Sequence, residues 1–424
     1  MSCELELARF QKIKLLKQKY AELCKTYFGW ERVPKSSFGR WLLEMLNYDN
    51  IDPIIPSTKE EISFNPIFNE ISEDFPNKIS PPLCFVNNLK DLNEYIYQYL
   101  IELDKILKVM EKNKLDLKNL NKLYLEILNL YNEENDYEKM KDVFTSKKES
   151  CTSSLKNILE PKVQEICDEI QKLSYKYALD VKNLKIKDKE VLNVSKSKQY
   201  TTIYYKNSPV KISNVIYDNL KSKIENEDLR SIWIMYKRYM TLLIDEKSVG
   251  NQAAVPHQLM DYLNENFGVD FECFASPMNS HFKNFCSAFK DTDSPFGSKG
   301  TFFEYFPKEG SFECNPPFTE NVMNKMVEHI HLLLDESTGP MSFIIFLPNW
   351  EDHNAIIDLT NSNYNRKDVI AKAKEHSYRD SEQVNCFKAV HDTKIFILQN
   401  DSGFRKWKPT DSKIKNLLLN FNSS

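Results

Sequence analysis

Along the first part of the chain, apolar residues recur at intervals of three and four positions. This spacing places them on one face of a helix and predicts amphipathic helices. A proline-rich connector, residues 52–82, interrupts the pattern. The predicted helices span residues 5–20, 38–46, 89–110, 115–131, 155–177 and 212–243.

In the last part of the chain, short apolar runs alternate with helical stretches, as expected for buried strands between helices. The order strand, loop, helix, strand over residues 311–347 indicates a doubly wound sheet, in which ligands bind at the carboxyl ends of the strands. We expect the two final strands to pair with each other in antiparallel fashion. The predicted strands are residues 270–274, 311–314, 341–347, 387–390 and 394–398, and the predicted helices are residues 256–267 and 319–334.

Glycine and histidine are distributed unevenly and support the same division. Only Gly29 and Gly39 precede position 250, whereas the other seven glycines and all seven histidines lie at or after it. Tight turns therefore concentrate in the last part of the chain. We predict a helical domain over residues 1–248 and an α/β domain over residues 249–424, so the expected fold class is α plus α/β.

The totals exclude several classes of protein. A chain of 424 residues with a net charge of −4 has no global basic field, so nucleic acid would have to bind a local patch. No apolar run approaches the roughly 20 residues of a membrane span, and the charged N-terminus is unlike a secretory signal. Nine dispersed cysteines without a Cys-x-x-Cys pair indicate reduced thiols, and we expect no metal site.

The most informative motif follows the predicted strand at residues 311–314 and reads Asn315, Pro316, Pro317, Phe318. An exocyclic amine on adenine, cytosine or an amide is a poor nucleophile, because its lone pair is conjugated. The Asn315 side-chain oxygen and a proline carbonyl can accept both amine hydrogens, which frees the lone pair for methylation. The prolines stiffen the loop, and the phenylalanine offers a face for a stacked base.

The same tetrapeptide is also typical of an ordinary turn, because asparagine favours turn starts and proline fixes φ. The strand before it, the helix after it and the strand that follows favour the functional interpretation. They place the motif at the ligand-binding edge of the predicted sheet.

Two further loops are candidates for ligand binding. One follows the strand at residues 270–274, where small side chains would let a cofactor approach the backbone, although the usual Gly-x-Gly pattern is missing. In the other, Asp291 or Asp293 would hold ribose hydroxyls and Phe296 would cover an adenine ring. Ordinary turns remain the alternative for both loops.

Two surfaces could bind other parts of a nucleotide substrate. Trp350 and Glu351 end the strand at residues 341–347 and suit a guanine, above all a cationic methylated one; a tryptophan packed under the next loop is the alternative. Residues 182–223 hold ten lysines and three acids with interleaved tyrosines, which suits phosphates and stacked bases. A lysine-rich surface hairpin or loop is the alternative for this segment.

Residues 251–409 resemble the cap-specific adenosine N6-methyltransferase family (CAPAM), also called phosphorylated CTD interacting factor. Residues 37–41 are a weaker landmark in the helical part. The resemblance implies a Rossmann-like class I methyltransferase domain after the helical domain. The blocks that carry it are residues 271–279, 286–293, 296–298, 311–318, 346–350, 388–393 and 398–404.

The resemblance also implies a reaction, the transfer of methyl from S-adenosylmethionine to N6 of 2′-O-methyladenosine beside the 7-methylguanosine cap of mRNA. Asn315 and Pro316 would orient N6, and Phe318 would stack on the adenine. The implied cofactor site comprises Ala275, Ser276, Pro277, Asn279, Asp293, Phe296, Gly297 and Ser298. The implied cap pocket comprises Glu320, Pro348 and Trp350, and the RNA-binding lysines are Lys196, Lys198 and Lys206.

Partners and location follow from the same resemblance. Animal members carry a WW domain that reads the RNA polymerase II tail, and no paired-tryptophan WW pattern occurs here, so we do not expect tail binding. We expect a nuclear enzyme acting on capped mRNA without membrane contact, with a cytoplasmic location as the alternative. Two other functions stay open: N6-adenine methylation of internal RNA or DNA, and a catalytically inactive cap-binding scaffold.

Overall fold

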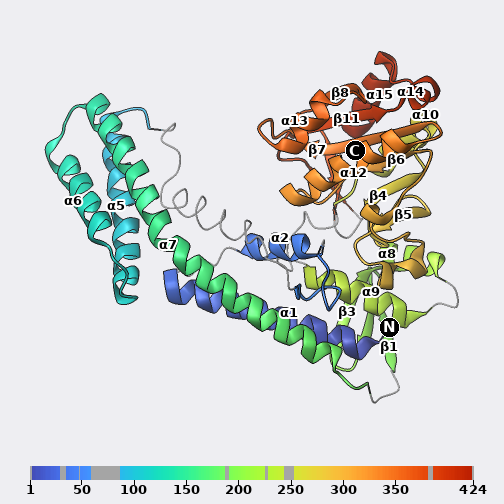
Figure 1. The fold of residues 1–424 in the computed structure, drawn as a ribbon, viewed down its shortest axis with the longest axis horizontal. Helices are drawn as coiled ribbons and strands as arrows, with labels where there is room; N and C mark the ends of the chain where they lie inside the picture. Colours follow the sequence, from blue (N-terminus) through green and yellow to red (C-terminus); the bar gives the residue numbers. More distant parts are fainter. Residues whose placement is uncertain are drawn as a thin grey trace. The chain divides into compact units, whose positions relative to one another are not determined.

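The computed structural model describes residues 2–28, 35–46, 48–58, 86–186, 191–224, 228–242, 253–380 and 385–422. The chain forms two compact units. One unit is Gln11–Leu184, and the other combines Met1–Phe10 with Lys185–Ser424. Helix α1 (Cys3–Phe28) contributes to both units (Figure 1). The functional division predicted at residue 248 stays a prediction.

The unit Gln11–Leu184 is helical, as its periodicity predicts. After α1 come α2 (Lys35–Met45), α5 (Leu89–Lys112), α6 (Lys118–Glu133) and α7 (Tyr137–Lys182). Apolar side chains spaced three and four apart on α5, such as Leu92, Ile96 and Tyr99, are buried, because α5 packs against α6 and α7. The connector predicted at residues 52–82 lies mostly outside the described residues.

Helix α7 is longer than the predicted segment 155–177 at both ends. It begins after Asp136, whose carboxylate accepts a hydrogen bond from the backbone N–H of Lys139 at 2.9 Å. Met140, Phe144 and Cys151 continue its buried stripe, but polar residues dilute the apolar signal there. The sequence pattern therefore locates the centre of this helix and misses its first turns.

The segment predicted as one helix, residues 212–243, is not one. It contains the end of β3 (Ser208–Ser213), then α8 (Asn214–Lys223) and α9 (Leu229–Leu242). Strand β3 pairs with β2 (Tyr200–Tyr205), which pairs with β1 (Leu192–Lys196), all antiparallel. Residues alternate between buried and exposed along β3, and the Ser213 hydroxyl accepts from the N–H of Ile216 to cap α8.

A six-stranded mixed sheet organises the last part of the chain, drawn yellow to red in Figure 1. The four strands β5, β4, β6 and β7 are parallel, and β11 runs antiparallel between β7 and β8. The strands are β4 (Phe271–Ala275), β5 (Asn284–Ser287), β6 (Gly310–Cys314), β7 (Met341–Pro348), β8 (Asn365–Ala371) and β11 (Thr393–Gln399). The chain is thus a helical region followed by a mixed α/β region.

Both faces of this sheet are covered. Phe343 and Ile345 of β7 share a core with α12 (Glu320–Glu336) and α13 (Asn354–Asn361). Ile344 and Phe346 share the opposite core with α10 (His257–Phe267) and α15 (Asp411–Asn422). Side chains alternate along a strand, so a continuous apolar run such as β7 can fill two cores.

The predicted pairing of the last two strands is wrong. The structure pairs β10 (Cys386–Lys388) with β9 (Ser377–Arg379), whereas β11 pairs with β7 and β8. Strand β11 is apolar and buried, so it is placed where both of its edges find partners, while β10 is short and largely exposed. The strand β11 was predicted correctly, but its pairing partners were not.

Two further absences hold for the described residues. None of their helices is long and apolar enough to cross a membrane. No group of three or more His, Cys, Asp or Glu side chains among them is arranged to hold a metal ion.

Candidate active site

Three candidate loops meet at one edge of the sheet, because β4, β6 and β7 are parallel neighbours. Residues 276–280 follow β4, residues 315–319 follow β6, and residues 349–353 follow β7. The order β4, β6, β7 therefore brings together three segments that lie about 30 to 40 residues apart in the sequence. This is the edge at which parallel sheets bind ligands.

The loop after β6 presents an acceptor without a donor. The side-chain oxygen Oδ1 of Asn315 is buried and accepts no hydrogen bond from the described residues. A buried acceptor left unpaired costs about 1–3 kcal/mol, so the oxygen can accept a donor from a water molecule or from a ligand at this edge of the sheet. Pro316 is buried, whereas Pro317 and Phe318 are exposed.

Helix α12 begins directly after the motif. Thr319 occupies the predicted N-cap position, but its hydroxyl makes no capping hydrogen bond and is buried without a partner among the described residues. The backbone N–H of Thr319 instead donates to the carbonyl of Pro317 at 2.8 Å, which closes a tight turn around Phe318. Glu320 lies exposed in the first turn of α12.

Two aromatic rings stand side by side at the ends of β6 and β7. Phe318 and Trp350 are 40% and 41% exposed, and their ring centroids are 6.5 Å apart at an interplanar angle of 77°. The turn after the buried Pro348 orients Trp350, because its N–H donates to the Pro348 carbonyl at 2.8 Å. Trp350 also contacts the next loop, because its ring centroid lies 6.1 Å from that of His353, but both Phe318 and Trp350 keep exposed ring surface that suits flat ligands.

The loop after β4 closes without glycine. The Oδ1 atom of Asn279 accepts from the backbone N–H of Ser276 at 2.7 Å and from its hydroxyl at 2.9 Å. Ser276, Pro277 and Asn279 are buried, and Ala275 is half-buried at the end of the strand. The side chain of Asn279 thus shapes the turn, and a ligand would meet this loop through its backbone and Ala275.

Three charged side chains hold this loop from other elements. Lys223 of α8 donates to the Ser280 hydroxyl at 2.7 Å and the Pro277 carbonyl at 3.2 Å. Glu272 of β4 accepts from the N–H groups of His281 and Phe282, both at 2.8 Å. Arg379 of β9 donates to the Asn279 carbonyl at 3.1 Å. Sequence reasoning missed all three; the only signal was a glutamate inside the apolar run of β4.

Burial changes the pKa values of the charged side chains around the loop after β4. Glu272 lies opposite Glu313 of β6 in the register of the parallel pair, and both are buried. Burial raises the pKa of Glu272 to about 7 and, together with the nearby Glu272 carboxylate, raises that of Glu313 well above its usual value. Burial also lowers the pKa of Lys223 to about 8. A raised pKa favours the protonated form of a carboxyl group, so the two glutamates carry less negative charge beneath the loop than their number suggests.

The second predicted cofactor loop begins with α11 (Lys290–Asp293) and the turn Ser294–Phe296. Asp293 has no exposed surface, and its carboxylate accepts from the hydroxyls of Tyr239 at 2.6 Å and Thr292 at 2.7 Å. Burial raises the pKa of this carboxyl to about 6. The side chain is therefore engaged within the protein, and its role toward a ribose stays a prediction.

The remaining residues of that loop are also closely fitted. Phe296 is buried, and the Ser298 hydroxyl lies 2.6 Å from that of Ser287. Gly297 has φ +104°, and a Cβ there would lie 2.7 Å from the Lys283 carbonyl oxygen, so only glycine fits. The loop is an ordered part of the sheet edge and not a loose surface turn.

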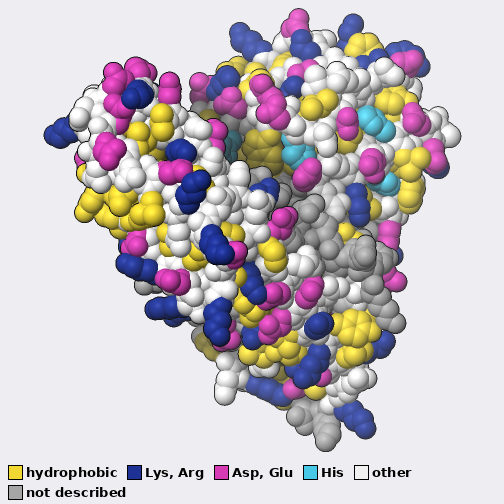
Figure 2. All heavy atoms as spheres, turned by 60° about the vertical axis from the view of Figure 1, so that its left-hand side comes forward, with side chains coloured by type: hydrophobic (Ala, Val, Ile, Leu, Met, Phe, Trp, Pro, Cys, Tyr) yellow, Lys and Arg dark blue, Asp and Glu magenta, His cyan; other side chains and the backbone are white. Residues whose placement is uncertain are grey.

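The lysine–tyrosine segment forms the antiparallel sheet β1–β3 followed by α8. Lys196 and Lys198 are exposed, and the Lys196 ammonium lies 3.5 Å from Asp218. Lys206 is paired with Glu4 of α1 and is thus partly neutralised. On the face drawn in Figure 2, basic and acidic side chains are interspersed, so no single-sign field covers it. Any RNA contact here would be local.

Comparisons with known proteins match the part of the chain that contains these loops. Residues 213–381 match the model of the family described as "Phosphorylated CTD interacting factor 1 WW domain". Despite that name, the matched residues run from the N-cap of α8 through β9 and include most of the six-stranded sheet.

Full-length relatives extend the match. The human mRNA (2′-O-methyladenosine-N(6)-)-methyltransferase is 30% identical over an alignment of 481 residues, which spans 99% of this chain and 67% of the human protein. The mouse protein of the same name is 29% identical over 488 residues, with the same coverage. These matches confirm the resemblance drawn from the sequence motifs. The chain therefore belongs to the phosphorylated CTD interacting factor family, the family of cap-specific adenosine N6-methyltransferases.

Proposed function

We propose that this protein transfers a methyl group from S-adenosylmethionine to N6 of 2′-O-methyladenosine next to the 7-methylguanosine cap of mRNA. The observation that carries the proposal is the buried Asn315 Oδ1, which lacks a donor at the carboxyl edge of the sheet. An exocyclic amine is a donor of the right kind. The full-length human and mouse relatives, named for this reaction, support the choice of amine.

The sheet order supports a Rossmann-like class I methyltransferase domain. Parallel strands β5, β4, β6 and β7 place three loops at one edge, and the antiparallel β11 inserts between β7 and β8. An antiparallel final strand commonly closes the sheet of adenosylmethionine-dependent methyltransferases. In this proposal residues 249–424 carry the chemistry, and residues 1–248 support RNA and cap binding.

The chain's own residues prepare the amine. Asn315 Oδ1 and the Pro316 carbonyl accept the two N6 hydrogens, which draws the nitrogen toward tetrahedral geometry and frees its lone pair. Phe318 stacks on the adenine and fixes the plane of the base, and the rigid prolines hold these groups in advance. The methylated nitrogen then loses a proton to water, so no dedicated general base is required.

The cofactor would lie along the ends of β4 and β5. Ala275 is small and half-buried, and the turn closed by Asn279 leaves the backbone at the end of β4 within reach of a ligand. When bound, S-adenosylmethionine supplies an electrophilic methyl group on a sulfonium. The ordered loop with Phe296, Gly297 and Ser298 completes this proposed site.

The cap would bind beside the target base. Trp350 is exposed next to Phe318, so a methylguanine ring on Trp350 would lie near an adenine on Phe318. The cationic base gains from the indole face, and Pro348 and Glu320 border the same region. Lys196 and Lys198 would contact phosphates further along the RNA, and we place the enzyme in the nucleus, with the cytoplasm as the alternative.

A direct assay tests the proposal. The protein is incubated with S-adenosylmethionine and an RNA that begins with a capped 2′-O-methyladenosine, and cap-containing digestion products are analysed by mass spectrometry. N6,2′-O-dimethyladenosine should form on the capped RNA. Equal rates on uncapped RNA or on DNA would replace the cap-specific function with general N6-adenine methylation. Failure to bind S-adenosylmethionine in calorimetry would leave a cap-binding scaffold.

A further inference from the structure

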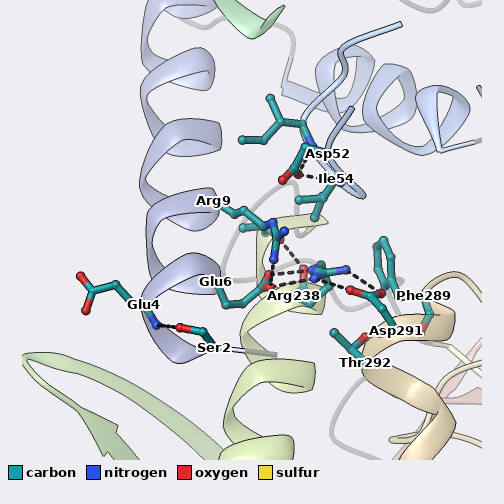
Figure 3. Close-up of polar contacts among 12 residues, drawn as sticks. Ser2, Glu4, Glu6, Arg9, Asp52, Ile54, Arg238, Phe289, Asp291 and Thr292 are labelled. Atoms are coloured by element: carbon teal, nitrogen blue, oxygen red, sulfur yellow. Dashed lines mark hydrogen bonds and ion pairs between the residues drawn. The ribbon is translucent and has the colours of Figure 1, made fainter. Parts of the chain in front are cut away.

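Arg238 on helix α9 is a guanidinium with no exposed surface. It donates to both carboxylate oxygens of Glu6, through Nε at 2.7 Å and Nη2 at 2.8 Å. It also donates to both oxygens of Asp291, through Nη1 at 3.1 Å and Nη2 at 3.0 Å. Figure 3 shows Arg238 between the two carboxylates, one from α1 and one from α11. The planar guanidinium of Arg238 therefore links α9 to both α1 and α11.

The next residue of α9 adds a second tie to α11. The Tyr239 hydroxyl donates to Asp293 at 2.6 Å, and its ring packs edge-on against Phe289 with centroids 5.3 Å apart. The guanidinium carbon of Arg238 lies 5.0 Å from the centre of the same Phe289 ring. Consecutive residues of α9 thus hold both ends of the segment 289–293.

The charges of this cluster balance one another. Burial alone would lower the pKa of Arg238, but the carboxylates of Glu6 and Asp291 raise it above its usual value. Arg9 lies 3.0 Å from the second oxygen of Glu6 and supplies a further positive charge. Removing one member of a buried ion network leaves the remaining charges without counter-charges. This loss destabilises a protein strongly, even where the intact network adds little to its stability.

Movement of α11 would reach the loop that follows it. The backbone N–H of Ser298 donates to the Asp293 carbonyl at 3.4 Å, and Gly297 fits tightly against the Lys283 carbonyl. A closely packed segment of this kind transmits a displacement, because it has little room to absorb one. The position of Phe296 and Ser298 therefore depends on what holds Asp291 and Asp293.

We propose that Arg238 is a positioning residue for the cofactor site: it fixes α11 through Asp291, and Glu6 of α1 fixes Arg238 in turn. This inference rests on the proposed function, because it assumes that residues 291–298 border the cofactor. It assigns part of the affinity for S-adenosylmethionine to two residues that the sequence pattern places in a separate helical domain. Residue 238 lies within the family match at 213–381, whereas Glu6 lies outside it.

Two variants of the 424-residue chain test this clamp, by which we mean the arrangement in which Glu6 holds Arg238 and Arg238 holds α11. Arg238→Lys keeps the charge but cannot hold two carboxylates in a planar fork, and Glu6→Gln keeps the shape while removing a charge. Lys237→Met is the matched control, because Lys237 is the adjacent buried cation of α9 and lies 3.6 Å from the ring centre of Phe10 of α1. Circular dichroism establishes that each variant is folded.

Two measurements separate the clamp on α11 from its proposed effect on the binding of S-adenosylmethionine. In cofactor-free protein, amide hydrogen exchange over residues 289–298 should speed up in Arg238→Lys and Glu6→Gln but not in Lys237→Met. The KM for S-adenosylmethionine should rise about tenfold in both variants, while kcat at saturating cofactor stays within about twofold.

Each contrary result has a distinct meaning. Unchanged exchange in Arg238→Lys, or equal acceleration in Lys237→Met, overturns the clamp. Faster exchange with an unchanged KM overturns its role in the cofactor site. If the unmodified protein neither binds S-adenosylmethionine nor transfers methyl, the proposed function fails, and with it the cofactor role, while the exchange data still decide whether Arg238 holds α11.

Discussion

At the scale of single residues, the motif that begins at Asn315 shows most clearly how a sequence can predict chemistry. Its motif is contiguous, so the acceptor, the rigid prolines and the stacking ring are read together. The structure adds that the Oδ1 atom is buried without a donor, which a sequence cannot show. A local motif thus predicted the kind of group, and tertiary burial gave the reason to expect a ligand there.

We expect Asn315→Ala to lower kcat by about a hundredfold or more, because it removes a preorganised acceptor for the amine. Cap binding should change little, since the cap is proposed to lie on Trp350. Asn315→Asp retains acceptor oxygens and should keep more activity than the alanine variant. Single-turnover methyl transfer and cap titration measure the two effects, and near-normal turnover in Asn315→Ala would refute the assigned role.

Lys223 makes a prediction about pH. Its pKa is about 8 in the folded protein and about 10.5 when unfolded, so between these values the unfolded chain binds a proton that the folded chain does not. Stability conferred by this group is therefore lost as the pH falls through 8 and regained as the pH rises toward 10.5.

The midpoint of thermal unfolding of the unmodified protein should accordingly rise relative to Lys223→Met between pH 8 and pH 10. The gain corresponds to on the order of 1–3 kcal/mol. Lys221→Met, a variant of a neighbouring lysine on α8, is the control and should show no such relative gain. Parallel curves for the unmodified protein and Lys223→Met would show that the ammonium is not buried against the loop.

At the scale of elements, the structure changes what the lysine–tyrosine segment means. Lys196 and Lys198 stand exposed on and beside β1, Lys206 is paired with Glu4, and Lys223 serves the loop after β4. Lysines that are indistinguishable by composition thus fall into three different environments. Only the first two remain good candidates for binding phosphate.

Replacing Lys196 and Lys198 together with glutamate should weaken RNA binding and reduce the slope of log affinity against log salt by about 1.4, because each lost phosphate contact on a single strand changes it by about 0.7. Lys206→Glu is a useful comparison and should change the slope less, because the ion pair of Lys206 with Glu4 is closer than the 3.5 Å contact of Lys196 with Asp218. Fluorescence anisotropy at several salt concentrations measures the slope. An unchanged slope in the double variant would show that the sheet β1–β3 does not bind RNA through these lysines.

At the scale of the whole molecule, the division into two compact units leads to a prediction about which part of the protein a bound cofactor stabilises. A ligand stabilises the part of the protein that binds it, by about 2.7 kcal/mol at a hundred times its dissociation constant. S-adenosylmethionine should therefore slow amide exchange over the six-stranded sheet, from β4 to β11, and leave exchange in α5, α6 and α7 unchanged. Hydrogen-exchange mass spectrometry tests this, and equal protection of both units would contradict it.

The sequence by itself determined many local features of this protein: most of the amphipathic helices, four of the six strands of the sheet (β4, β6, β7 and β11), and the motif at residues 315–318. These follow from periodicity and from neighbouring residues, which the chain carries in order. The sequence did not determine that β11 pairs with β7 and β8, because strand partners are chosen by burial of both edges. Nor did it separate β3, α8 and α9, whose mixed pattern imitates one long helix.

Only the tertiary structure decided which charged residues serve the proposed site. By sequence, four charged residues look like ordinary surface residues, yet Glu6, Arg238 and Arg379 are buried and Lys223 is half-buried, each among partners far along the chain. The physical reason is that a buried charge persists only where the fold supplies its counter-charge or hydrogen bonds. Such complements come from distant segments, and no local pattern records them.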